Sequence, residues 1–229
     1  MEVALSSVLL GRFRALGMHL AVSLLILFAL YALLRWVWYP GVFFEMAGGW
    51  EGFRILLAVD LVIGPCLTFV VFNNTKSVRH LARDLSIVAL IQAIFLVVGV
   101  AAVFHSRPLA VVHVFDTFYV LNHEALDAAG VSGEQIQRVK GSDDFLYYVD
   151  VPQAKAAFLK EHVKSLVNGE LPLQFQVDRY LQLPKTIDPN ILHGETASGC
   201  LRVDLESAYR QGAACFDPKT QEFSSFVAK

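Results

Sequence analysis

The sequence is poor in charged residues. Only 17% of its 229 residues are Asp, Glu, Lys or Arg, whereas 55% are hydrophobic, and the formal net charge is −2. A nucleic-acid surface needs clustered Lys and Arg in excess, and the chain has no zinc-finger spacing or basic heptad region. These absences exclude nucleic acid as a partner. With a mean hydropathy of +0.49, the leading class is a membrane protein.

The sequence also lacks the motifs of common catalytic and metal sites. Its three cysteines form no C-x-x-C pair, and no His/Cys spacing typical of zinc ligands is present. There is no G-x-S-x-G nucleophile elbow and no phosphate-binding glycine loop. We therefore expect no catalytic residues, no metal and no cofactor, and we predict that the protein is not an enzyme.

Two of the three cysteines are close in the sequence. A Cys200–Cys215 disulfide would close a loop of about 15 residues and stabilise the fold by roughly 3 kcal/mol, provided that the compartment is oxidising. The alternative is two unpaired buried thiols. Cys66 lies in an apolar stretch, where a lone thiol is usually a packing residue.

Hydrophobic residues are concentrated in the first half of the chain, which predicts two domains. We expect a membrane domain over residues 1–107 and a soluble domain over residues 108–229, large enough to bury its own core. Three segments are long and apolar enough to cross a bilayer, at about residues 16–38, 55–72 and 85–104. Because the first segment lacks an A-x-A-like cleavage site, we interpret it as an uncleaved anchor.

The basic residues of the membrane domain predict its orientation. They lie before the first span and between the second and third, at Arg12, Arg14, Lys76, Arg79 and Arg83. The positive-inside rule places both segments in the cytoplasm. In a bacterium this predicts an inner-membrane protein with a cytoplasmic N-terminus and a periplasmic C-terminal domain.

The second span, within LLAVDLVIGPC, contains a carboxylate. Asp60, Gly64 and Thr68 are spaced four residues apart, so they share one small and polar helix face. An intramembrane Asp costs a few kcal/mol and usually faces a protein partner or a water-filled cavity. Small residues and hydrogen bonds drive helix association in lipid, so this face is a candidate partner-binding site.

Three further residues are assigned structural roles in the membrane domain. Pro65 lacks an amide hydrogen and should kink the second span. Arg35 lies at a depth similar to that of Asp60 and is a candidate ion-pair partner. Gln92 is a polar group deep in the third span. The Asp60 face therefore has three alternative roles: internal packing, contact with another protein's membrane helix, or proton or ion chemistry.

Four segments carry a resemblance to a known family. They are RFRALGMHLAVSLLI, WYPGVFFEMAGG, LLAVDLVIGPCLTFVVFN and SRPLAVVHVFDTFYVL, in this order over about the first 120 residues. Together they resemble the type IV pilin accessory proteins of the TfpX/TfpZ type. The chain differs from a pilin itself, because Gly11-Arg12-Phe13 is not followed by the residues that a prepilin peptidase recognises.

The resemblance implies a chaperone-like factor of type IV pilus biogenesis and fimbrial assembly in the bacterial inner membrane. It implies interaction with the cognate major pilin before or during polymerisation, and inner-membrane pilus assembly components are further candidate partners besides membrane lipid. A pilin before assembly has an apolar membrane helix and a periplasmic head, so both domains of this chain could contact it. The alternative is a membrane-anchored periplasmic ligand-binding or enzymatic protein.

The soluble half is predicted to be a small α+β domain. Residues 109–121 are rich in β-branched and aromatic residues and predict one or two strands, and residues 145–151 predict another. A helix follows Asn122 as its cap and stops at Gly130. A longer helix within residues 152–169 should pack on a sheet through Ala157, Phe158, Val163, Leu166 and Val167. Alternation over residues 171–183 predicts a half-buried strand, and residues 217–220 predict a turn.

Overall fold

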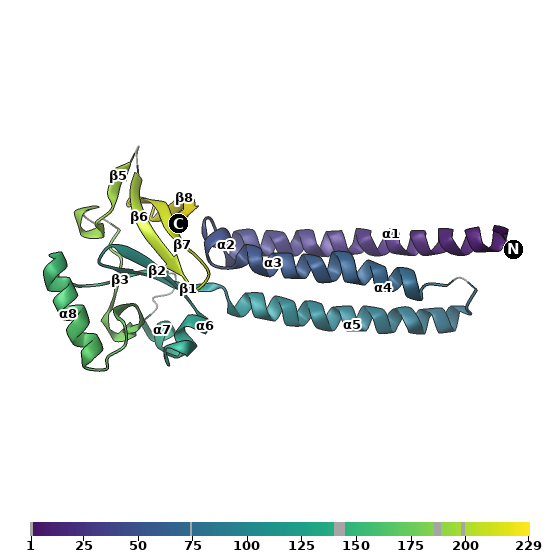
Figure 1. The fold of residues 1–229 in the computed structure, drawn as a ribbon, viewed down its shortest axis with the longest axis horizontal. Coiled ribbons are helices and arrows are strands. Elements are labelled where there is room, and N and C mark those ends of the chain that lie inside the picture. Colours follow the sequence, from purple (N-terminus) through teal and green to yellow (C-terminus); the bar gives the residue numbers. More distant parts are fainter. Residues whose placement is uncertain (1, 74, 140–144, 186–188, 198–199) are drawn as a thin grey trace. The chain divides into compact units, whose positions relative to one another are not determined.

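The computed structural model of the chain describes residues 2–73, 75–139, 145–185, 189–197 and 200–229 (Figure 1). The chain forms two units, each composed of two segments. The first, called the helical unit below, comprises Met1–Val37 and Trp50–Phe104. The second, called the sheet unit, comprises Trp38–Gly49 and His105–Lys229.

The helical unit consists of three long helical segments that run alongside one another (Figure 1). In two of them the α-helix passes into a π-helical stretch, in which the hydrogen bonds connect residues five apart. The first segment is α1, Glu2–Leu33, followed by η1, Leu34–Trp38. The second is α3, Gly49–Leu57, followed by η2, Ala58–Ile63, and α4, Gly64–Val71. The third is α5, Val78–His105.

The three predicted spans are confirmed as helices long and apolar enough to cross a membrane. They cover Val8–Trp38, Gly49–Val71 and Val78–His105, with mean hydropathies of 2.2, 2.1 and 2.8. At 1.5 Å per residue each exceeds the roughly 30 Å of a hydrocarbon core. Each helix extends several residues beyond at least one of its predicted ends.

Two basic segments of the helical unit, before the first span and between the second and third, lie at one end of it. Arg12 Nε donates a hydrogen bond to the carbonyl of Phe72 at 3.0 Å, which joins the first turns of α1 to the end of α4. Its guanidinium lies 5.9 Å from the centre of the Phe69 ring. Lys76 pairs with Asp84 of α5 at 2.7 Å. The two basic segments identified in the sequence therefore share one end of the unit.

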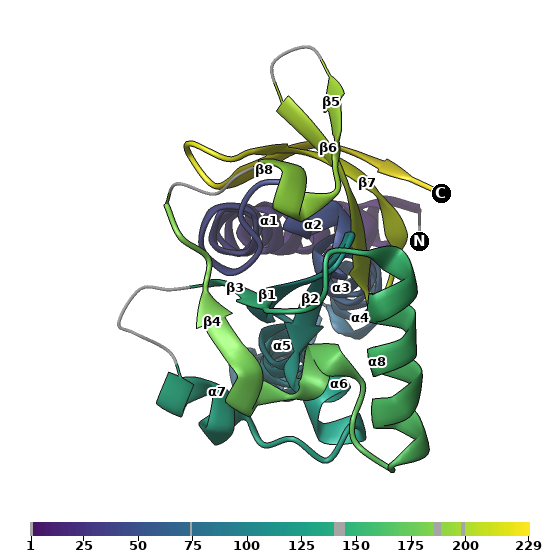
Figure 2. The same ribbon diagram turned by 90° about the vertical axis from the view of Figure 1, so that its left-hand side faces the viewer.

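The sheet unit is built on a mixed sheet of eight strands among the described residues (Figure 2). Its main order is β4-β3-β1-β2-β6-β7-β8, with β5 paired to β6. The pairs β1–β3 and β2–β6 are parallel and the others are antiparallel. The strands are β1 Pro108–Val114, β2 Thr117–Asn122, β3 Leu146–Val149, β4 Tyr180–Gln182, β5 Glu195–Ala197, β6 Cys200–Ser207, β7 Gln211–Asp217 and β8 Glu222–Ala228.

Short helices and turns complete the sheet unit. They are α2 Phe43–Met46, α6 His123–Ala128, α7 Gly133–Val139 and α8 Lys155–Val167, with 3-10 turns η3 Leu173–Phe175, η4 Val177–Arg179 and η5 Pro189–Leu192. The predicted cap of α6 is confirmed, because the Asn122 side chain accepts a hydrogen bond from the amide of Ala125 at 2.8 Å. Gly130 then adopts a φ of +74°, which favours glycine after a helix end.

Both faces of the central strands are buried, because successive side chains of a strand point to opposite faces. On one face, Ala110, Val112 and Val114 of β1 pack with the region of α6, α7, η3 and η4. On the other face, the rings of Phe118, Phe216, Phe223 and Phe43 cluster with centroids 4.9 to 5.8 Å apart.

The segment Trp38–Gly49 follows the first span but belongs to the sheet unit. Ser207 Oγ donates a hydrogen bond to the carbonyl of Met46 at 2.6 Å, and Gly48 lies so close to the Tyr209 ring that a Cβ there would be 2.8 Å from it. The predicted boundary at residue 107 lies near the division after Phe104. The sheet unit also contains this earlier segment, which the sequence assigned to the membrane domain.

Two predictions for the sheet unit are wrong in detail. Residues 171–183 form the turns η3 and η4 before a strand of three residues, β4. The apolar positions fit this arrangement because Leu173, Val177 and Tyr180 recur every three or four residues and are buried. The Gln176 amide also donates a hydrogen bond to the nearby backbone carbonyl of Leu171, which favours turns over an extended strand.

Helix α8 is present as predicted, but it does not bury the predicted apolar face. Of the residues expected to pack, only Phe158 is half-buried, and its ring stacks on Phe115 at 4.4 Å. Val163, Leu166 and Val167 are exposed. The inward side is instead partly polar, since Glu161 pairs with Arg179 at 3.1 Å.

The predicted disulfide is confirmed. Cys200 of β6 and Cys215 of β7 are bonded, with a Cα–Cα distance of 5.6 Å and a sequence separation of 15 residues. The β7–β8 hairpin confirms the turn expected at residues 217–220, where the Lys219 amide donates to the Asp217 carboxylate at 2.8 Å.

Candidate partner-binding site

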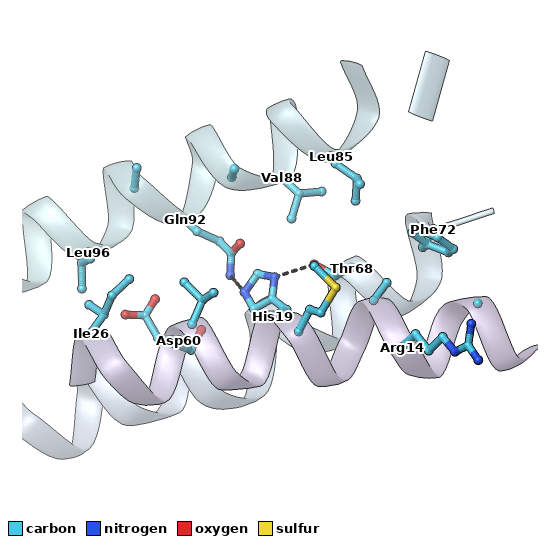
Figure 3. A pocket seen from close by; sticks show the side chains of 17 residues that line it. Arg14, His19, Ile26, Asp60, Thr68, Phe72, Leu85, Val88, Gln92 and Leu96 are labelled. Carbon is cyan, nitrogen blue, oxygen red and sulfur yellow. Dashed lines mark hydrogen bonds between the residues drawn. The ribbon is translucent and has the colours of Figure 1, made fainter. Parts of the chain in front are cut away.

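A polar cluster joins the three helices of the helical unit around His19 of α1 (Figure 3). His19 Nδ1 and Thr68 Oγ1 of α4 are hydrogen-bonded at 2.8 Å, and His19 Nε2 lies 3.1 Å from the amide nitrogen of Gln92 of α5. The tautomer of the imidazole determines which group donates in each of these two contacts. One ring therefore links α1 to both other helices.

Gly64 allows this cluster to form. A Cβ at this position would lie 1.8 Å from Gln92 Nε2 and 3.0 Å from His19 Nε2. Any larger side chain must displace the Gln92 amide or α5 itself. The predicted proximity of Gly64 and Thr68 is thus realised, and the small residue serves to bring a third helix close.

Asp60 lies on the same side of the second span but outside the hydrogen-bonded cluster. Its side chain is only 6% exposed, and it interacts electrostatically with His19. Among the residues that the structure describes, its carboxylate forms no hydrogen bond and no salt bridge. In Figure 3 the carboxylate points into the space between the helices.

That space is a cavity of about 730 Å³ between α1, the second span and α5. Its polar lining comprises Arg14, His19, Ser23, Asp60, Thr68 and Gln92. The remaining lining is apolar or small. In the described part of the helical unit, α1 packs closely against η2 and α4, whereas side-chain contacts such as His19–Gln92 connect it to α5.

The other residues that the sequence assigned to this region have different surroundings. Arg35 is half-buried in η1, and it forms no salt bridge with Asp60 in the described chain. Pro65 is buried, and the backbone on either side of it stays helical, because the π-helical stretch η2 takes up the mismatch that proline introduces. Cys66 is an unpaired, exposed cysteine.

Sequence reasoning missed His19. It lies within the predicted first span, and an ionisable residue in such a span is itself a sign of a functional or structural polar contact. Together with Gln92 and Thr68 it forms a site that can accept and donate hydrogen bonds. No group of three or more metal-ligating side chains occurs in the searched, described residues.

A second buried histidine lies in the sheet unit. The pKa of His113 is lowered to about 4, chiefly by burial and in part by the nearby His193, while a backbone hydrogen bond with Leu192 acts in the opposite direction. Its Nε2 atom has no hydrogen-bond partner among the described atoms. The adjacent cavity is about 10 Å³, so His113 is a core residue of β1.

Comparison with known proteins places the chain among relatives of one kind. It is 30% identical over 106 residues to the fimbrial assembly protein of serogroups C1 and C2 of Dichelobacter nodosus, which covers 46% of this chain and 81% of that protein. The chain belongs to this fimbrial assembly protein family.

Two further relatives are the D. nodosus fimbrial assembly proteins of serogroups E1 and I. They are 30% and 31% identical to the chain over 106 residues, and the match covers 41% of each relative. The chain therefore spans about two fifths of the length of these two relatives. No family model and no solved structure matches the chain.

Proposed function

We propose that this protein is an inner-membrane accessory factor of type IV pilus assembly, of the TfpX/TfpZ type. It acts without catalysis, by contacting the cognate major pilin before or during polymerisation. The observation that carries the proposal is the similarity to fimbrial assembly proteins in a chain with three helices able to cross a membrane. A pilin before assembly is a membrane protein too, so both proteins would meet in one bilayer.

The proposed orientation has the basic end of the helical unit in the cytoplasm and the sheet unit in the periplasm. The shared end of Arg12, Arg14 and Lys76 supports it through the positive-inside rule. The Cys200–Cys215 disulfide supports it as well, because such bonds persist in oxidising compartments.

In this proposal the two units have different tasks. Asp60 and Thr68, which line the cavity, contact pilin within the membrane, whereas Gly64 of the same face holds α5 close; the sheet unit contacts the periplasmic head of pilin. Helix α8 is the best candidate for that second contact, since Leu159, Val163 and Leu166 form an exposed apolar stripe at helical spacing.

A ligand-binding role of the sheet unit is the second candidate function. It is favoured by a cavity of about 690 Å³ whose lining includes Arg138, Glu170 and Phe175. Cavities of this size hold small molecules, and the mixture of charged and apolar groups would suit an amphipathic ligand.

The proposal is tested by deleting the gene and by copurifying the full-length protein from membranes of cells that express pilin. We expect surface pili to be lost while pilin itself remains present, and pilin to copurify with the solubilised protein. A variant with Val163→Asp and Leu166→Asp should weaken copurification, whereas Lys160→Asp on the same helix is the matched control. Normal piliation in the deletion strain together with no copurified pilin would reject the proposal.

A further inference from the structure

We propose that the cavity of the helical unit is a docking groove for the transmembrane helix of the pilin, with Asp60 accepting a hydrogen bond from it. The identity of the occupant depends on the proposed function. The groove itself is argued from the shape, the lining and the unsatisfied carboxylate of this chain.

The cavity is elongated along the helices. Its lining extends from Gly11 to Ile26 on α1 and from Leu85 to Leu96 on α5. At 1.5 Å per residue these stretches are about 22 Å and 16 Å long. A rod-shaped molecule that lies parallel to the helices fits this shape, whereas a compact solute would occupy a small part of it.

Small residues form both walls of the groove. Gly11 and Ala15 line it from α1, and Ala89 and Ala93 line it from α5. Each pair is four residues apart and therefore lies on one helix face. Paired small residues at this spacing let another helix backbone come close, which is how helices associate in lipid.

The buried carboxylate of Asp60 points to an occupant that brings a hydrogen-bond donor. It is more than nine-tenths buried, faces the groove and has no hydrogen bond within the described chain. A polar group without a hydrogen bond in a water-free region is strongly unfavourable. A donor on the docked helix at the depth of Asp60 would remove this cost.

A lipid acyl chain fits this lining less well than a helix does. An acyl chain has no donor, so it would leave Asp60 unsatisfied, and it would press against His19 and Gln92. These two residues already satisfy each other across α1 and α5. His19 and Gln92 therefore need no hydrogen bond from a partner. Asp60 is the lining residue that would accept one.

The test is site-specific photocrosslinking of the full-length protein in cells that express pilin. The probe replaces Met18 or Val22, which line the groove and are 73% and 57% exposed. The matched control is Leu25, which lies on the same helix, is 72% exposed and is not part of the lining. We expect pilin adducts from the two groove positions and few from the control.

The role of Asp60 is tested in the same experiment. Asp60→Leu removes the acceptor and should lower the adduct yield about tenfold, which corresponds to about 1.4 kcal/mol, the order of one net hydrogen bond. Asp60→Asn retains an acceptor oxygen and should restore part of the yield. Fractionation verifies that both variants insert, and a yield for Asp60→Leu equal to that of the unsubstituted protein overturns the role of Asp60. If Asp60→Leu fails to insert, Asp60→Ala, which also lacks the acceptor, takes its place.

The remaining outcomes overturn the docking groove. They are equal adducts from Leu25 and the groove positions, adducts with a second copy of this chain, adducts with lipid alone, and adducts with another membrane protein. Copurification of pilin without groove adducts would reject this inference and leave the proposed function intact. If neither copurification of pilin nor groove adducts are observed, both this inference and the proposed function are rejected.

Discussion

The two units of the molecule treat large apolar side chains in opposite ways. In the sheet unit, side chains such as Phe118, Phe216 and Tyr147 are fully buried between strands and helices. In the helical unit, Leu25, Phe28 and Val97 are exposed, although they belong to the most apolar helices of the chain. Expulsion of water can therefore hold the sheet unit together, whereas lipid removes that driving force between membrane helices.

The polar contacts differ in the same sense. The sheet unit spreads them over caps, hairpins and strand ends, as at Asn122 and Asp217. The helical unit concentrates them in one layer around His19, next to the closest approach of α5 at Gly64. A few small and polar residues therefore determine the packing of the helical unit, whereas many apolar residues determine that of the sheet unit.

The largest expected effect is that of removing the disulfide, which should destabilise the sheet unit and leave the helical unit unchanged. A variant with Cys200→Ser and Cys215→Ser should lower the free energy of unfolding of the sheet unit by about 3 kcal/mol, because a loop of 15 residues is no longer closed in the unfolded state. Hydrogen exchange of the full-length protein in detergent should show loss of protection in β6 and β7. Equal loss of protection in α1 and α5 would contradict the separation of the units.

A smaller effect of acid should be specific to the sheet unit. Because the pKa of His113 is lowered to about 4 in the folded state, the unfolded state binds more protons between pH 6.5 and pH 4. The free energy of unfolding should therefore fall as the pH decreases, by about 2 kcal/mol between pH 7 and pH 5.

This pH dependence can be measured by urea titration in detergent, read by pulse hydrogen exchange of β1 and β2 peptides. His113→Gln cannot gain the proton, so its curve should be flatter over the same pH range. Carboxylates contribute to both curves, and the difference between them isolates His113. Parallel curves would show that its burial does not affect acid stability.

The smallest expected change concerns the helical unit. Gly64→Ala places a Cβ where the Gln92 amide lies and should destabilise the packing of α5 by on the order of 1 kcal/mol. Gly17→Ala is the matched control, since a Cβ there meets no atom within 4 Å. Thermal unfolding in detergent compares them, and equal midpoints would argue against close packing at Gly64.

Much of the fold could be predicted because local signals and tertiary packing agree. The β-branched residues around Val112 and Val120 form two antiparallel strands where one or two strands were expected. The three spans follow from length and hydropathy alone. The prediction of a strand near Phe175 was wrong because apolar residues at alternate positions also fit turns. Only the contacts of Gln176 distinguish turns from a strand here.

The candidate site was only half visible in the sequence. Spacing along one helix places Asp60, Gly64 and Thr68 on a common face, because helix geometry fixes that relation. No such rule relates helices that are distant in sequence, so the bonds of His19 to Thr68 and Gln92, 49 and 73 residues away, required the structure. For the same reason the sequence could not show that the apolar residues of α8 are exposed.

The membership of Trp38–Gly49 in the sheet unit has a consequence for how the protein is made. The Met46 carbonyl accepts its hydrogen bond from Ser207, 161 residues later in the chain. At roughly 5–20 residues per second, a ribosome needs on the order of 10–30 s to add that length. During this interval Phe43 and Phe44 have been synthesised, but the strands that bury them have not. The sheet unit therefore acquires its complete core only after β6, β7 and β8 have been synthesised.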